Sequence, residues 1–524
     1  MQSGMNGRAV SRFALVAATL VVCGCASAQL DLSARQTSEI LTDLQARVDR
    51  ERAAAKTASD AKPAPKPEAA VPVPPVLSLK DALRIAGTQN RNLMSDREGL
   101  TLSALSLLDA KNAVGPRLAG SVSTILRGDD RAEEVRTNAG TLSVTSLLAT
   151  GATASVTGDL SQSHDLGDTV PTNAGGRVTA RISQPLLRGA GDESSHEALT
   201  SAERQSLYDV RAFELSRQDL ALRVQRDFYG LVTQRQVIRN RDSSLKSFEF
   251  LQRRSDRLFE LGRASEVDKF RAAREYLVAE NGLIDANQEY EARLDRFKIL
   301  LGVEATTKLD VAEEIPTPRV VELELRRAID VALANRLDLM TSRDTVEDAE
   351  RRLRIRQRDL LPDLSVEAIG TRAAPAGSSR VGTPLDHDTY SLGLSLELPL
   401  DRVRERGALR AGRIELDRAR RDLSLTEDSV ILDVRDALRN LRSSEASLRI
   451  QVQIAASEEK NAKIANIRFQ NGEIGNRDLT DALTNLADAR DRLIREQANV
   501  ETARTQLLRN LGVLYLDEEG IWRE

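Results

Sequence analysis

The two halves of the chain repeat the same landmarks in the same order, and this duplication constrains the fold more than any other feature. The stretch SLKDALRIAGTQNRNL at 78–93 is similar to ELRRAIDVALANRLDL at 324–339. Further landmarks match in pairs: Pro116 with Pro362, Pro185-Leu186 with Pro399-Leu400, Gly262 with Gly472, and Gly302-Val303 with Gly512-Val513. We therefore expect two structural repeats, 77–302 and 303–516, followed by a C-terminal tail at 517–524.

Each repeat ends in two long segments with helical character. Residues 192–260 contain no proline and a single glycine, Gly230. At 1.5 Å per residue, such a helix reaches roughly 100 Å. The expected helices are 192–260 with 265–301 in the first repeat, and 407–470 with 476–511 in the second. Apolar residues recur at three- and four-residue spacing, so the sequence predicts two long helical hairpins.

The hairpin tips are expected near 262 and 472, where RLFELGRASEVDKFRAA and RFQNGEIGNRDLTDALT interrupt the helical pattern. Glycine tolerates the left-handed conformation that ends a helix. Ser265 and Asn476 are suited to cap the returning helices. Asp268 and Asp478 would then lie in the first turns, where the helix dipole favours an acid.

Between its first helix and its hairpin, each repeat shows the alternation of a β-strand. The expected strands are 116–127 and 176–187 in the first repeat, and 363–372 and 389–400 in the second. One face is apolar and the other polar or charged. This pattern fits a membrane β-barrel with a wet lumen and also a half-buried soluble sheet. Residues 141–163, with Gly151 between two alternating stretches, are suited to form an extra hairpin, inside a barrel or outside it.

The N-terminus has the features of a secretory signal, expected over 1–24. Arg8 and Arg12 precede an apolar stretch that is too short for a stable membrane anchor. The tetrapeptide Val22-Cys23-Gly24-Cys25 is typical of a bacterial lipoprotein processing site. Cleavage there would make Cys25 the lipidated first residue of the mature protein. Ala26-Ser27-Ala28 offers an alternative, ordinary cleavage site. Residues 25–76 are expected to be a helical and proline-rich extension and linker.

Composition and motifs argue against an enzyme or a nucleic-acid-binding protein. Charged residues make up 29% of the chain and aromatic residues 3%, with a net charge of −4. That composition suits long solvated helices, and no basic face stands out. The histidines His164, His196 and His387 lack metal-ligand spacing, and the only cysteines are Cys23 and Cys25. We found no phosphate-binding, nucleophile-elbow or dinucleotide motif, so no cofactor is expected.

From about Leu77 to Leu516 the chain resembles the TolC-like family of outer-membrane efflux channels. The resemblance depends on the duplicated order, the two tip motifs, the repeated Pro-x-Leu, QPLLRG at 184–189 and the LGV that closes each hairpin. It implies an α+β membrane protein, mainly α. Three subunits would share one outer-membrane β-barrel and one periplasmic α-helical barrel. The protein would lie in the outer membrane, and a long domain would extend into the periplasm.

The resemblance also implies sites and partners. Family members dock at their tips onto a periplasmic adaptor protein, which connects them to an inner-membrane pump. The matching tip residues are Leu261, Gly262, Arg263, Asn471, Gly472 and Glu473. Acids that narrow the closed tunnel mouth correspond to Asp478 and Asp481, with Asp268 at the first tip. In relatives a basic residue braces this mouth, but here Ile474 takes its place. Polar strand residues expected to face the lumen include Arg177, Arg181 and Glu397.

The function expected from these features is a passive trimeric conduit of a tripartite efflux or type I secretion-like system. A lipid-anchored coiled-coil envelope scaffold without a pore is the alternative. It needs no strands with charged residues on one face. A periplasmic adaptor is less suitable, because adaptors usually contain one helical hairpin. The transported substrate, the adaptor and the pump are not encoded in recognisable residues.

Overall fold

The structure is a computed structural model that describes residues 74, 76–129, 132–165, 173–313, 315, 323–375, 384–517 and 521. The expected signal 1–24, Cys25 and most of the extension 25–76 lie outside these residues. The described chain forms two compact units. The first takes in Gly99–Val210 and Thr341–Leu423. The second takes in Arg211–Met340 and the described parts of Arg52–Glu98 and Ser424–Glu524.

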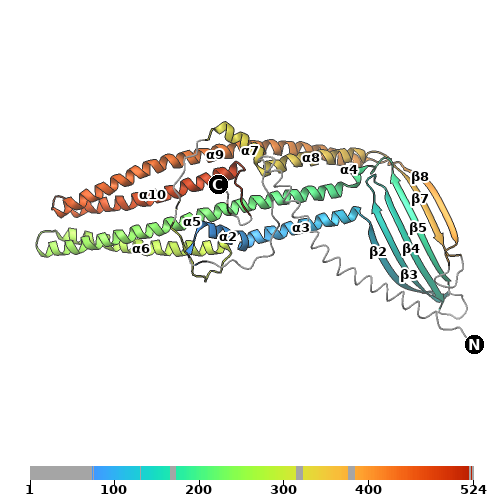
Figure 1. Cartoon of the computed structure of the whole chain (residues 1–524), viewed down its shortest axis with the longest axis horizontal. Coiled ribbons are helices and arrows are strands. Elements are labelled where there is room, and N and C mark those ends of the chain that lie inside the picture. Colours follow the sequence, from blue (N-terminus) through green and yellow to red (C-terminus); the bar gives the residue numbers. More distant parts are fainter. Residues whose placement is uncertain are drawn as a thin grey trace, which may run out of the picture. The chain divides into compact units, whose positions relative to one another are not determined.

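A six-stranded antiparallel sheet dominates the first unit. Its strands are β2 (Arg117–Asp129), β3 (Ala132–Leu147), β4 (Thr153–Asp165), β5 (Asn173–Pro185), β7 (Asp363–Ala373) and β8 (His387–Glu397). The order across the sheet is β2-β3-β4-β5-β7-β8. Figure 1 shows these strands side by side, with β2 and β8 at the two margins. The strand expected to reach 400 ends at Glu397, shortly before Pro399, which has no N–H to offer a ladder.

The region 141–163 falls within β3 and β4, a hairpin inserted between two strands that the repeat predicted. Register links this hairpin to its neighbours on both sides, since Leu118 pairs with Val144 and Val156 pairs with Ala180. The turn between β3 and β4 contains Gly151 at φ +88°. Residues 141–163 are thus part of the same sheet as the four expected strands, and the hairpin extends that sheet from four strands to six.

The second unit consists mainly of helices, and the first unit contains helices beside its sheet. The helices among the described residues of both units are α2 (Leu79–Gln89), α3 (Arg91–Val114), α4 (Asp192–Ser195), α5 (Glu197–Glu260), α6 (Glu266–Leu301), α7 (Leu325–Asn335), α8 (Leu337–Arg358), α9 (Val403–Gln470) and α10 (Asn476–Asn510). Helices α5 and α9 contain 64 and 68 residues. The helix expected from 192 is divided at His196, where a single turn ends before α5 begins.

The two repeats superpose in element order: α2 with α7, α3 with α8, β2 with β7, β5 with β8, α5 with α9, and α6 with α10. Their local chemistry has diverged. Ser78 and Asp81 form a capping box at the start of α2, whereas Glu324 precedes α7 without a side-chain cap. A short parallel pair, β1 (Val76–Leu77) with β6 (Asp310–Val311), lies beside these helices.

Within the described ranges, no helix combines the length and the apolar composition that a membrane span requires.

In the view of Figure 1 the helices α9, α10, α5 and α6 appear in that order, and α10 contacts α6 as well as α5. Polar contacts support the central pairing. Asn240 of α5 donates to Asp491 of α10 at 2.6 Å, and Arg241 lies 3.3 Å from the same carboxylate. Burial raises the pKa of Asp491, because these two partners offset only part of the cost of removing its charge from water.

Candidate functional site

Over most of its length the sheet has one apolar and one polar face, and the parity of the residue number decides which face a side chain takes. Even-numbered positions pair with even-numbered positions, except at a register shift that places Asp129 opposite Ala132. Near one end of β7 and β8 the even positions are charged, since Arg372 lies 3.4 Å from Asp388. On β8 the even positions are Tyr390, Leu392, Leu394 and Leu396, and all four side chains are exposed. The odd positions of the same strand include Thr389, Ser391 and Ser395. A sheet with this division can separate lipid from water.

The three strand residues expected to face a lumen all occupy the polar face. Arg181 forms an ion pair with Glu367 of β7 at 3.2 Å. Arg177 pairs in register with Asp159 of β4, and Glu397 pairs with Asp363. Charges of both signs therefore alternate with hydroxyl groups on this face.

The first hairpin tip is a glycine-terminated helix followed by a capped one. Gly262 has φ +68°, and the N–H groups of Arg263 and Ala264 both donate to the Leu258 carbonyl, at 2.8 and 3.2 Å. This geometry satisfies carbonyls at the end of α5. Ser265 accepts from the Asp268 N–H at 3.2 Å, which is the expected cap. Leu261 is 70% exposed at the outermost point of the turn.

The second tip has the same backbone turn but a different cap. Gly472 has φ +79°, and the Glu473 N–H donates to the Arg468 carbonyl at 2.9 Å. The prediction that Asn476 caps α10 is wrong, because Gly475 occupies the cap position without a side-chain bond. Asn476 is instead the first helical residue. Hydrogen bonds from Asn471 and Arg468 lower the pKa of the Glu473 carboxyl.

Several contacts hold the two tips together. The Asn476 amide donates to the buried Ser255 hydroxyl of α5 at 2.6 Å. Arg254 donates to the Phe469 carbonyl at 3.2 Å, and its guanidinium lies 4.5 Å from the Phe469 ring centre. Beneath these contacts, Ile474 packs against a core formed by the following side chains: Phe248, Leu251, Ala272, Ala462, Ala465, Phe469, Leu479 and Ala482. Apolar packing thus occupies the place where relatives are expected to have a basic brace.

Of the three acids expected near the tunnel mouth, Asp268 and Asp478 lie in the first turns of α6 and α10, and Asp481 lies in the second turn of α10. Asp268 accepts from the Ser265 hydroxyl at 2.7 Å and lies 3.6 Å from Arg271. Asp478 is exposed in the first turn of α10. Asp481 is exposed as well and lies 3.8 Å from Arg477 on its own helix. Neither Asp478 nor Asp481 is therefore used in holding the two tips together.

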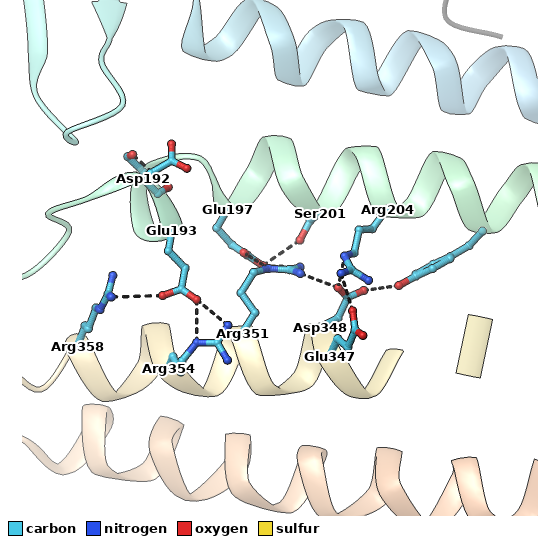
Figure 2. A network of polar contacts seen from close by, with 12 residues as sticks. Asp192, Glu193, Glu197, Ser201, Arg204, Glu347, Asp348, Arg351, Arg354 and Arg358 are labelled. Carbon is cyan, nitrogen blue, oxygen red and sulfur yellow. Dashed lines mark hydrogen bonds and ion pairs between the residues drawn. The ribbon is translucent and has the colours of Figure 1, made fainter. Parts of the chain in front are cut away.

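Sequence reasoning missed a polar network that joins α4 and α5 to α8 in the first unit (Figure 2). Asp348 is 2% exposed and lies at the centre of the network. It is 3.0 Å from Arg204, 2.6 Å from Arg351 and 2.6 Å from the Tyr208 hydroxyl, which donates to it. Burial, together with the hydrogen bond to Asp348, raises the pKa of Tyr208 to about 12.

The network extends toward the sheet in two further steps. Glu197 at the start of α5 accepts from Arg351 at 2.7 Å. Glu193 of α4 accepts from Arg354 at 2.8 Å and lies 3.4 Å from Arg358 (Figure 2). Glu193 and Glu197 lie four positions apart, and the arginines that they contact on α8 lie three and four positions apart, but neither spacing indicates that the two segments meet.

Two glycines bring backbones into direct contact where each hairpin ends. Gly302 has φ +81°, and a Cβ there would overlap the Gln89 carbonyl at the end of α2. Gly512 has φ +71°, and its Cβ would lie 2.8 Å from the Asn335 carbonyl carbon at the end of α7. Both pairs occupy equivalent places in the two repeats. The LGV motif therefore marks a close backbone approach as well as a helix end.

Among the described residues, no group of three or more His, Cys, Asp or Glu side chains is arranged to hold a metal ion.

Residues 328–513 match the model of a family described as outer membrane efflux protein. No curated protein sequence matches the chain. Solved structures match over most of its length. They include the Campylobacter jejuni CmeC outer membrane channel, at 16% identity and a TM-score of 0.63 over 83% of this chain and 85% of that one. The Vibrio cholerae outer membrane protein VceC matches at 15% identity and a TM-score of 0.63, over 83% and 96%.

The Neisseria gonorrhoeae MtrE outer membrane channel, solved in its open state, matches at 13% identity and a TM-score of 0.60, over 83% of this chain and 89% of that one. At these identities the matches establish the fold. Together with the family match in the second repeat, they confirm the resemblance that the duplicated motifs indicated.

Proposed function

We propose that this chain, as a member of the outer membrane efflux protein family, forms a passive trimeric conduit across the outer membrane and the periplasm. Substrate would be driven through it by an inner-membrane pump, reached through a periplasmic adaptor. The observation that supports this function most directly is the sheet. It presents an exposed apolar face, a polar face, and two margins that are unpaired among the described residues.

The apolar face suits lipid. Tyr390 is 94% exposed, and Leu392 is 77% exposed in the middle of β8. Contiguous apolar surface of this kind is rare on a soluble protein unless something covers it. The opposite face carries hydroxyl groups and paired charges, as expected for the wall of an aqueous pore.

The margins of the sheet require partners. Among the described strands, β2 pairs only with β3 and β8 pairs only with β7. Unpaired N–H and C=O groups cost several kcal/mol each in lipid, so an open sheet cannot remain there. Pairing β2 of one copy with β8 of the next would satisfy both margins. Three copies would then close the wall.

The outer helices of the second unit support the same assembly. On α6, the exposed residues Phe270, Leu277 and Ile284 recur every seven positions. On α9, Ile450 and Ile464 are exposed two heptads apart. A heptad of apolar residues is the pattern by which one helix packs against another. These exposed residues would allow α6 of one copy to pack against α9 of the next.

Membrane extraction and bilayer recording test the function. We expect the full protein to resist carbonate extraction, to cross-link as a trimer and to give discrete conductance steps in planar bilayers. Release by carbonate as a monomer without conductance would instead support the envelope scaffold. Lipidation of Cys25 is a separate proposal, tested by the mass of the mature N-terminus.

Asp478 and Asp481 are proposed to line the tunnel mouth, with Asp268 nearby at the first tip. Three copies of the first two would place six carboxylates around one axis and attract cations. We expect Asp478→Ala combined with Asp481→Ala to raise the concentration of hexamminecobalt that blocks half the current by about tenfold, equivalent to about 1.4 kcal/mol. The measurement is a planar-bilayer titration. Asp285→Ala, which removes an exposed acid farther along α6, is the control. An unchanged block would remove the carboxylate ring.

Residues Leu261–Arg263 and Asn471–Glu473 are proposed to dock onto the adaptor. Leu261 is the most suitable anchor, since it is a large apolar side chain that is 70% exposed. We expect Leu261→Ser to cost about 1 kcal/mol of adaptor binding, or about fivefold in the amount recovered by cross-linking in cells. Conductance of the purified protein should not change. Lys246→Ser, at an exposed position on α5 away from the tip, provides the control; equal recovery of adaptor with both variants would contradict docking through Leu261.

A further inference from the structure

We propose that the inserted hairpin β3–β4 is part of the barrel wall, so that three subunits close a barrel of eighteen strands. The inference rests on the proposed trimeric channel. Six strands per chain in three copies give 6 × 3 = 18. The four strands that the repeat predicts would give only 4 × 3 = 12. A barrel of eighteen strands would enclose a wider pore than a barrel of twelve.

The first support is the continuity of the apolar face. Val144 of β3 pairs with Leu118 on one side and with Val156 on the other. Val156 in turn pairs with Ala180 of β5. The even positions of the inserted hairpin that carry large apolar side chains are Leu142, Val144, Val156 and Leu160, and all four are exposed. The hairpin thus continues the band that β8 presents at Leu392 and Leu394.

The second support is the continuity of the polar face. Odd positions of the hairpin carry hydroxyl groups that bond across strands. The Thr141 hydroxyl donates to Asp159 at 3.0 Å. The Thr137 and Ser163 hydroxyls lie 3.2 Å apart. The same chemistry recurs between repeat strands, where the Thr179 and Thr371 hydroxyls lie 3.4 Å apart. A hairpin that left the wall would have no need to keep both faces in register with its neighbours.

The third support is the attachment of the hairpin's turn. The Gly191 N–H donates to the Thr150 carbonyl at 3.0 Å, and the Gln184 amide donates to the same carbonyl at 3.0 Å. A Cβ on Gly151 would lie 2.6 Å from the Gly189 carbonyl oxygen. The turn is therefore packed against the segment that leads from β5 into α4. That segment lies at the end of the sheet from which the helices leave.

The wall would then be much wider than one made of repeat strands alone. Neighbouring strands are about 4.8 Å apart, and tilted by about 40° they give a diameter of about 36 Å for eighteen strands and about 24 Å for twelve. The cross-section would increase about twofold. Barrels of sixteen to eighteen strands enclose an aqueous channel. The outer-membrane part of the conduit would accordingly admit bulkier hydrated solutes than twelve strands would.

Spin labels on single cysteines test the placement in reconstituted full-length protein. The chain's own cysteines lie only at positions 23 and 25, so the unsubstituted protein measures the background. We expect labels at 142 and 156 to be accessible to oxygen in the lipid, and labels at 143 and 157 to a water-soluble nickel chelate. Labels at 392 and 391 of β8 should show the same contrast. If the labels at 142 and 156 are in water while the label at 392 is in lipid, the hairpin lies outside the barrel wall. The eighteen-strand proposal then fails, and the channel proposal is not affected. If 392 is also in water, the channel proposal fails with it.

Imaging of the trimer by electron microscopy gives an independent measurement. The intact protein should show a barrel about 36 Å across. Deleting 132–165 would join β2 to β5 directly as a hairpin. Most of the large apolar residues of β2 and β5 lie at even positions, and the deletion removes an even number of residues, so the shortened chain keeps the same side chains on each face of the sheet. Its barrel should narrow by about a third. A diameter of about 24 Å for the intact protein would overturn the proposal, whether or not the deletion variant folds.

Discussion

Replacing Gly302 by alanine is expected to prevent the chain from accumulating as a folded protein, or to lower its free energy of unfolding by more than about 4 kcal/mol. Two effects add. The left-handed conformation at φ +81° costs an alanine about 1–2 kcal/mol. The new Cβ would also lie 2.5 Å from the Gln89 carbonyl carbon, so the end of α2 would have to move. Circular dichroism during urea titration of the purified protein measures the loss.

Gly262→Ala is the matched control for this prediction. Gly262 has φ +68°, but nothing lies within 4 Å of a Cβ built there. The substitution should therefore cost only the conformational part, about 1–2 kcal/mol. Gly512→Ala should resemble Gly302→Ala in direction, because its Cβ would meet the backbone of Asn335. Equal losses for Gly302→Ala and Gly262→Ala would show that the close approach to α2 contributes nothing.

Asp348→Ala is expected to destabilise the unit that contains the sheet by about 3 kcal/mol or more. Removing this carboxylate takes from Arg204 and Arg351 the most buried of their acceptors, and the more exposed acids that remain stabilise the two charges less. The Tyr208 hydroxyl would lose its acceptor as well. The loss is measured as a reduced urea midpoint for the full protein, with the dependence on denaturant unchanged.

Two other substitutions in the same network should reduce stability less, and they test whether the loss depends on the burial of Asp348 or only on the number of ion pairs removed. Tyr208→Phe removes one hydrogen bond to Asp348 and should cost about 1 kcal/mol. Glu347→Ala removes another acid bound to Arg204, at 2.9 Å, but this acid is 63% exposed and its loss should cost less than about 1 kcal/mol. If Glu347→Ala were as damaging as Asp348→Ala, the central role of the buried carboxylate would be wrong.

The parts of the fold that follow from local rules could be predicted from the sequence. Period-two alternation located the strands, and glycine with φ near +70° marks both tips, because a helix end requires that conformation. The cap at Ser265 followed from the same rules, whereas the cap expected at Asn476 did not form. There the chain places Gly475 at the cap position and uses the Asn476 amide to reach Ser255 on another helix. Such a partner is invisible to local reasoning.

The remaining features depend on which segments meet in three dimensions. In the sequence, Glu193 and Glu197 are typical of acids in the first turn of a helix. The structure shows that they bind Arg354 and Arg351 of α8. Equivalent junctions of the two repeats also use different chemistry. Asn90 donates to the Leu300 carbonyl at 2.6 Å, whereas its counterpart Arg336 pairs with Asp338 at 2.6 Å and with Asp433 at 2.8 Å. Although burial opposes it, the hydrogen bond from Arg336 lowers the pKa of Asp338.

The matched register of β3 and β4 with their neighbours has a consequence for how such a sheet changes over time. A hairpin inserted into another hairpin brings in two strands at once, so every later strand keeps its direction and its inward and outward sides. Gain or loss of 132–165 would therefore add or remove two strands of the sheet without changing the sequence of either hairpin tip. The number of strands in the sheet and the sequence of the tips can thus evolve independently.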